Sequence, residues 1–207
     1  MESPTGLASF EVRWILPGPL DPALLGWFSR IPASTEARED AYLLVPALDG
    51  LSVKIRGDRE LDLKSRVQRM GDIELTPQAR GRLESWQKSS FRFGADSERA
   101  VDSAMWRRVR KVRTMSWHDG EGWLPSRPPE TSQRPKCAVE LTDITTRDER
   151  WWTLGFEASG PEDERLEAIE TAAREVFDVP VPNGLVLGPE DSGPYSEWLR
   201  RAATPGA

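Results

Sequence analysis

The clearest pattern along the chain is an alternation of apolar and polar side chains near its start, where the sequence reads SFEVRWIL. Successive side chains of a β-strand point to opposite faces of the sheet. One face then carries Phe10, Val12, Trp14 and Leu16, and the other carries Ser9, Glu11, Arg13 and Ile15. The sequence predicts a strand with one apolar, aromatic face and one face on which a carboxylate and a guanidinium are neighbours.

Period-two alternation recurs along the rest of the chain. It predicts strands at Ala41–Val45, Leu51–Arg56, Glu60–Val67, Arg108–Trp117, Cys137–Thr145 and Trp151–Ala158. Turn signals at Asp49-Gly50 and Gly57-Asp58 separate three of these segments. Strands joined by tight turns pair with their neighbours in sequence, so we expect an antiparallel meander and not a parallel sheet.

Helical spacing and capping residues predict helices between the strands. We expect them at Pro22–Ser29, Thr76–Phe91, Ser97–Met105, Glu162–Phe177 and Pro194–Ala202. The stretch Leu124–Pro135 is rich in proline and polar residues and is expected to be a loop. The fold class is therefore α+β, with an antiparallel, strand-rich body. We expect one domain over residues 1–180, to which a C-terminal loop and short helix at 181–207 also belong.

Composition narrows the classes of function. The 207 residues carry a formal net charge of −6, which argues against a protein that coats nucleic acid. The single cysteine, Cys137, excludes an internal disulfide and a cysteine-rich zinc site, and a cytoplasmic setting is expected. No apolar run approaches the ~18 residues of a membrane span, and no signal peptide is evident. We therefore expect neither a nucleic-acid coat nor a membrane partner.

The familiar catalytic motifs are missing. The sequence contains no phosphate-binding G-x-x-x-x-G-K-[ST] loop, no G-x-G-x-x-G and no H-E-x-x-H. Its only histidine, His118, is expected in a loop, so a histidine-centred triad or zinc cluster is not credible.

Charged pairs on the polar strand faces are the candidate chemistry. The basic pairs are Lys54 and Arg56, Lys64 and Arg66, and Lys111 and Arg113. Single carboxylates lie on three other strands: Glu11, Glu140 and Glu157. Arginine offers a fixed fork of donors and lysine a mobile point charge, so such pairs suit a chain of phosphates. Carboxylates on facing walls suit Mg²⁺ or Mn²⁺, which prefer oxygen ligands. A sheet with one solvated face also shows alternating charges, so this alternative stays open.

The order of basic and acidic strands resembles the CYTH superfamily, the triphosphate tunnel metalloenzymes, over about Phe10–Phe177. Members open with E-x-E-x-K. Two registers are open here, and we prefer the one with Ser9 in place of the first glutamate, Glu11 as the second and Arg13 at the lysine position. The resemblance implies an eight-stranded antiparallel barrel with helices outside and a tunnel that binds triphosphate with Mg²⁺ or Mn²⁺.

Three functions follow from this resemblance and from the charges. The first is a metal-dependent phosphohydrolase acting on a small-molecule polyanion such as a triphosphate. In it Glu11 and Arg13 are catalytic, and Glu11, Glu140 and Glu157 hold the metal. The substrate-binding residues would be Lys54, Arg56, Lys64, Arg66, Lys111 and Arg113.

The second function is a non-catalytic tunnel protein that binds a phosphorylated or other anionic ligand, and the third is an interaction protein with solvated strands. The second is motivated by Ser9, Thr142 and Ser159, which stand where further carboxylates would be expected.

Overall fold

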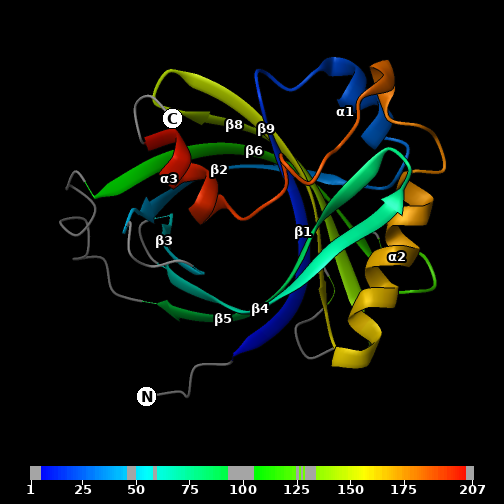
Figure 1. Cartoon of the computed structure of the whole chain (residues 1–207), viewed down its shortest axis with the longest axis horizontal. Coiled ribbons are helices and arrows are strands. Elements are labelled where there is room, and N and C mark those ends of the chain that lie inside the picture. The colour runs from blue at the N-terminus through cyan, green and yellow to red at the C-terminus, as the bar shows by residue number, and fades with distance from the viewer. Residues whose placement is uncertain are drawn as a thin grey trace.

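The strands of the chain close into an antiparallel barrel (Figure 1). The computed structural model describes residues 6–45, 50–57, 60–92, 105–124, 126, 128 and 134–203. The strands are β1 (Leu7–Pro17), β2 (Ser34–Leu43), β3 (Leu51–Arg56), β4 (Glu60–Thr76), β5 (Ala79–Arg92), β6 (Trp106–His118), β7 (Trp123–Leu124), β8 (Lys136–Thr146) and β9 (Glu149–Ser159). The helices are α1 (Pro22–Phe28), α2 (Arg165–Val176) and α3 (Tyr195–Ala203), with short 3-10 turns at Glu162–Glu164 and Pro182–Gly184.

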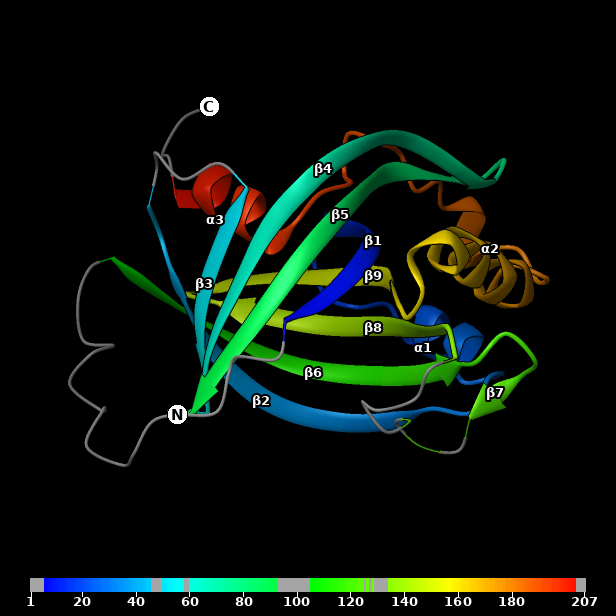
Figure 2. The ribbon, with the colours of Figure 1, turned by 90° about the horizontal axis from the view of Figure 1, so that it is seen from below.

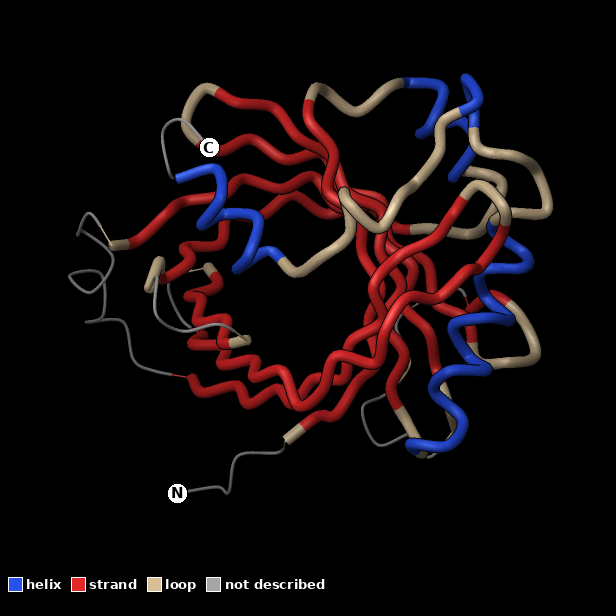
Figure 3. Tube along the Cα trace, viewed as in Figure 1, coloured by secondary structure: helices blue, strands red, loops and turns tan. Residues whose placement is uncertain are grey.

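Eight of the strands form the closed ring. Their order is β2-β3-β4-β5-β1-β9-β8-β6, and pairing between β2 and β6 closes it, while β7 adds a short extra strand to β6. All these pairs are antiparallel. The tube in Figure 3 follows the ring, with α2 running along its outside. The predicted α+β fold with an eight-stranded antiparallel barrel is confirmed.

The apolar face of β1 forms the centre of the main core. Phe10, Val12, Trp14 and Leu16 are each buried and belong to one cluster with residues of α1, α2, β8 and β9. Trp14 meets Phe156 edge to face, with 6.5 Å between ring centroids, and its Nε1 donates to the carbonyl of Arg80 at 2.9 Å. This core lies outside the barrel, beneath α2, so the opposite face of β1 points into the barrel interior.

The three helices occupy opposite ends of the barrel. Figure 2 shows α1 and α2 at one end and α3 beside β3 at the other. Helix α1 begins as predicted, with Asp21 as N-cap accepting from the Ala23 amide at 2.8 Å, and Pro22 in the first turn. The predictions of α2 and α3 are also confirmed, although the segment Glu162–Glu164 is a 3-10 turn. Within the described residues, no helix has both the length and the apolar character needed to cross a membrane.

The predicted helix Thr76–Phe91 is wrong. The segment instead turns after β4, where the Thr76 hydroxyl accepts from the Gln78 amide, and continues as β5. Leu83 and Trp86 suggest helical spacing, but Leu83 packs in the outer core while Trp86 lines the barrel interior. A strand buried on both faces thus imitates the apolar spacing of a helix.

Several strand boundaries also differ from the prediction. β2 begins at Ser34 and not at Ala41. The prediction missed its first residues, STEARED, because polar side chains occupy both faces there. β4 continues to Thr76, beyond the predicted end at Val67. The predicted helix Ser97–Met105 lies outside the described residues except for Met105, as do Asp49 and Asp58 of the two predicted turns.

Candidate functional site

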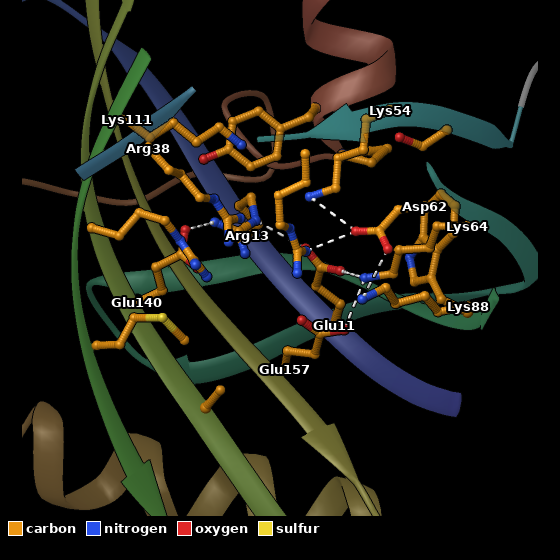
Figure 4. A pocket seen from close by; sticks show the side chains of 18 of the residues that line it. Glu11, Arg13, Arg38, Lys54, Asp62, Lys64, Lys88, Lys111, Glu140 and Glu157 are labelled. Atoms are coloured by element: carbon orange, nitrogen blue, oxygen red, sulfur yellow. Dashed lines mark hydrogen bonds and ion pairs between the residues drawn. The ribbon is translucent and has the colours of Figure 1, made fainter. Parts of the chain in front are cut away.

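A cavity of about 520 Å³ lies inside the barrel and collects nearly all the charged residues that the sequence singles out. Lining residues include Glu11, Arg13, Lys54, Arg56, Lys64, Lys111, Arg113, Glu140 and Glu157. Because Glu11, Lys64 and Lys111 point inward from three different strands, the alternative of solvated sheet faces does not hold for them. In Figure 4, Arg13, Arg38 and Glu140 lie on one side of the cavity and Asp62, Lys64 and Lys88 on the other.

Arg66 is the one predicted substrate-binding residue that does not line this cavity. Its Nη1 donates to carboxylates of Glu84 on β5 and Glu197 on α3. Its guanidinium also lies 5.7 Å from the ring centroid of Trp86. In this structure Arg66 therefore ties the last helix to the barrel wall.

One wall of the cavity is built on Arg13. Its Nε donates to Glu11 Oε1 at 2.9 Å, and its Nη1 donates to Glu140 Oε1 at 3.3 Å and to Thr153 Oγ1 at 3.2 Å. The side chain is only 6% exposed, and Tyr195 covers it with its ring centroid 5.0 Å from the guanidinium carbon. Arg13 therefore bridges two of the three glutamates predicted to hold a metal.

Lys64 and Arg113 contact the second carboxylate oxygens of Glu11 and Glu140, and Lys64 also contacts Glu157. Lys64 Nζ contacts Glu11 Oε2 and donates to Glu157 Oε1 at 3.0 Å. Arg113 contacts Glu36 and Glu140. Burial would raise the pKa of Glu157, but Lys64 holds it at about 2. Burial likewise opposes ionisation of Glu140, whose pKa is nevertheless held well below its usual value by Arg113 and Arg13.

Asp40 is the centre of a second cluster on β2, opposite the first. Its carboxylate is completely buried and lies 3.1 Å from Lys111 Nζ, 3.3 Å from Lys54 Nζ and 3.4 Å from Arg38 Nε. Burial would raise the pKa of Asp40, but these cations lower it below its usual range. Burial in turn lowers the pKa of Lys54 to about 8. Removing the Asp40 carboxylate would therefore leave three cations without their shared counter-ion and destabilise the folded state.

Asp62 joins this cluster to the rim formed by β3, β4 and β5. Its carboxylate accepts from Arg56 Nη2 at 2.7 Å and from the Ser90 hydroxyl at 2.6 Å, and lies 3.3 Å from Lys88 Nζ. Although burial opposes it, neighbouring cations led by Lys54 hold the pKa of Asp62 at about 2.

Two tyrosines line the cavity beside the Asp40 cluster. The rings of Tyr42 and Tyr195 stack with 5.8 Å between centroids. Lys111 Nζ donates to the Tyr42 hydroxyl at 2.6 Å and lies 3.7 Å from the centroid of the Tyr195 ring. The terminal helix α3 thus contributes a side chain to the site through Tyr195.

Sequence reasoning missed several lining residues: Glu36, Arg38, Tyr42, Lys88 and Tyr195. The alternation of charges in TEARED could have revealed Glu36 and Arg38 once that segment was recognised as a strand. No local signal identifies Tyr195, because its place depends on how α3 packs against the barrel end.

The cavity lining carries an excess of positive charge and holds buried N–H donors without acceptors in the part of the chain that the structure describes. Eight basic and five acidic side chains line it. Three buried N–H groups of lining residues have no hydrogen-bond acceptor among the described residues: Arg56 Nε, Arg113 Nε and Trp86 Nε1. A buried donor without an acceptor is unfavourable, so this arrangement favours an anionic ligand that accepts from several directions.

The three glutamates predicted as metal ligands do not fit a divalent cation in this arrangement. Glu11, Glu140 and Glu157 face the cavity from neighbouring strands, but each is paired with arginine or lysine. Over the described ranges, no group of three or more histidine, cysteine, aspartate or glutamate side chains is arranged to hold a metal ion. Each of these carboxylates is instead compensated by a cationic side chain of the protein itself.

Stability is expected to depend steeply on pH in acid. The pKa values of Asp62 and Glu157 are each lowered to about 2, so below about pH 4.5 the unfolded state binds more protons than the folded state. The contribution of these two carboxylates to the free energy of unfolding should therefore fall steadily between about pH 4.5 and pH 2. Urea unfolding across this range measures it. Glu157→Gln should make the fall shallower, whereas a level profile down to pH 3 would contradict these pairings.

Comparisons with known proteins give a fold likeness only. No protein-family model matches this sequence, and no curated protein matches it at a significant level. A conserved hypothetical protein from Pyrococcus furiosus is similar in structure, at 16% identity and TM-score 0.46, over 90% of this chain and 98% of that one. The Mimivirus capping enzyme triphosphatase matches at 11% identity and TM-score 0.44, over 83% of this chain and 89% of that one. An RNA triphosphatase of S. pombe matches at 11% identity and TM-score 0.39, over 87% of this chain and 79% of that one. Similarity at these scores says nothing about what the chain binds, so we infer its ligand from its own side chains.

Proposed function

We propose that the barrel interior binds a small polyanion that carries several phosphate groups. The observation that carries this proposal is the excess of three basic over acidic side chains in the cavity lining, where three buried N–H donors also have no acceptor among the described residues. The chain as a whole has a net charge of −6, so the positive excess is concentrated in the cavity. Such local concentration attracts and orients an anion.

The arrangement of the donors favours a chain of phosphates over a single one. Arg56 and Arg113 come from β3 and β6, and Trp86 comes from β5, so the donors belong to three different strands of the barrel. Guanidinium groups recognise phosphate oxygens with fixed, forked donors. The cavity volume of about 520 Å³ falls within the roughly 300–1,000 Å³ typical of small-molecule sites.

Binding without catalysis is the better supported of the two ligand-binding functions that the sequence predicts. Metal-dependent hydrolysis requires a cation among Glu11, Glu140 and Glu157, and those carboxylates are paired with Arg13, Lys64 and Arg113. Hydrolysis therefore stays a prediction of the sequence, and the experiment below includes it.

Isothermal titration calorimetry with tripolyphosphate tests the proposal. In low salt with a chelator present, we expect binding of about one tripolyphosphate per chain, and added sodium chloride should weaken it through screening. Sulfate at the same ionic strength is the control for a site that accepts any small anion. No heat of binding at millimolar tripolyphosphate would contradict the proposal. Phosphate release on adding Mg²⁺ or Mn²⁺ would instead favour the hydrolase.

A further inference from the structure

Arg13 lies between two carboxylates of the barrel wall, Glu11 on its own strand β1 and Glu140 on β8. Across the wall formed by β1, β9 and β8, Arg13 is paired with Gly155, and Gly155 is paired with Glu140. In the adjacent row, Glu11 is paired with Glu157. The Arg13 side chain crosses β9 to reach Glu140, as Figure 4 shows from inside the cavity.

Gly155 makes this crossing possible. A Cβ atom at position 155 would lie 2.7 Å from the guanidinium carbon of Arg13 and 2.9 Å from each of its two terminal nitrogens. Any larger residue would therefore push the guanidinium away from the wall. A glycine within a strand commonly marks such a close approach, and here it seats the Arg13 cation at a fixed place.

The carboxylates of this wall are already neutralised by side chains. Glu11 contacts Arg13 and Lys64, Glu140 contacts Arg13 and Arg113, and Glu157 contacts Lys64. Three carboxylates therefore face three cations. A divalent cation added here would meet three resident positive charges within a buried site, where charge repulsion is weakly screened.

We propose that Arg13 is a resident cation that replaces a divalent metal in this wall, so that the cavity takes up its polyanion without a metal ion. The second half of this statement rests on the proposed function, whereas the first half concerns the protein alone. The basis of the proposal is the position of the Arg13 guanidinium between Glu11 and Glu140.

Titration with Mn²⁺, followed by the electron paramagnetic resonance signal of the free ion, tests the first half without any polyanion. The wild-type chain should not bind Mn²⁺ at about 1 mM. Arg13→Gln removes the cation from one oxygen each of Glu11 and Glu140, of which the Glu140 oxygen still accepts from the Thr142 hydroxyl, and this variant should bind about one Mn²⁺. Arg13→Lys keeps the charge and should bind none. Circular dichroism checks that each variant is folded. Arg150→Gln removes a half-exposed arginine from the outside of β9 and should behave as wild type.

Tripolyphosphate calorimetry in chelator and in Mg²⁺ tests the second half. Wild-type affinity should be no tighter in Mg²⁺ than in chelator, because Mg²⁺ binds the free polyanion and competes with the cavity. The inference is overturned if wild type binds Mn²⁺ and Glu140→Gln abolishes it, or if Mg²⁺ tightens tripolyphosphate binding tenfold or more. If no tripolyphosphate binds in either buffer, the proposed function fails while the Mn²⁺ result still decides the role of Arg13.

Discussion

Asp40→Asn is expected to lower the free energy of unfolding by about 3–5 kcal/mol, the range for removing one partner of a buried ion pair. Asp40 is completely buried and lies within 3.4 Å of cationic nitrogens of Arg38, Lys54 and Lys111. The substitution keeps the shape of the side chain but leaves three positive charges close together with less compensation. The repulsion among these charges raises the free energy of the folded state and not that of the unfolded state.

Urea unfolding at pH 7 measures this loss, and the preceding residue on β2 provides a matched control. Glu39 points outward and pairs with Arg108 and Arg110 at the surface, so Glu39→Gln should cost less than about 1 kcal/mol. Added tripolyphosphate should restore part of the stability of Asp40→Asn, because an anion bound to the folded state compensates the exposed cations. Equal losses from both substitutions would contradict the central role of Asp40.

Removing Lys64 and Arg113 together is expected to raise the dissociation constant for tripolyphosphate about 100-fold. Loss of a hydrogen bond to a charged group costs about 1.5–3 kcal/mol, and each 1.4 kcal/mol is a tenfold change. The two side chains share no partner: Lys64 contacts Glu11 and Glu157, while Arg113 contacts Glu36 and Glu140. Arg13 nevertheless connects their partners Glu11 and Glu140 in one ion-pair network, so the expected change is set at the lower end of two additive losses.

Calorimetry on Lys64→Gln, Arg113→Gln and the double variant measures the two contributions. The control double variant, Arg69→Gln with Arg110→Gln, removes the same charge from the same two strands, β4 and β6, at side chains that are 62% and 80% exposed. The control should change the affinity less than about threefold, since exposed charges are screened by salt. If both double variants weaken binding equally, the net charge of the chain and not the cavity determines the affinity.

Most of the barrel was predictable because its strands alternate in a regular way. The sequence predicts the faces of β1 correctly, since Phe10 and Trp14 pack outside while Glu11 and Arg13 line the cavity. The prediction is wrong for β5, where both faces are buried and Leu83 and Trp86 imitate helical spacing. It misses the first half of β2, where polar residues occupy both faces and no apolar period marks the strand.

The candidate site was predictable as a set of residue types and not as a set of contacts. Period two places Lys54, Lys111 and Glu140 on inward faces, and each of them lines the cavity. The sequence gives no sign that Arg66 would turn to Glu84 and Glu197, because Glu197 lies on the last helix. Nor does it indicate Tyr195, which reaches the cavity from the same helix.

Alternation is a local property of the backbone, so the sequence alone predicts an antiparallel, strand-rich chain whose candidate charged residues share one face of each strand. Which charges neutralise one another depends on how the strands pair in the barrel. Arg13 meets Glu140 across 127 positions of sequence, and it does so because barrel closure brings β1, β9 and β8 side by side and Gly155 leaves room for the guanidinium. The three glutamates that the sequence predicts as metal ligands are therefore ion-paired with cations that line the same cavity.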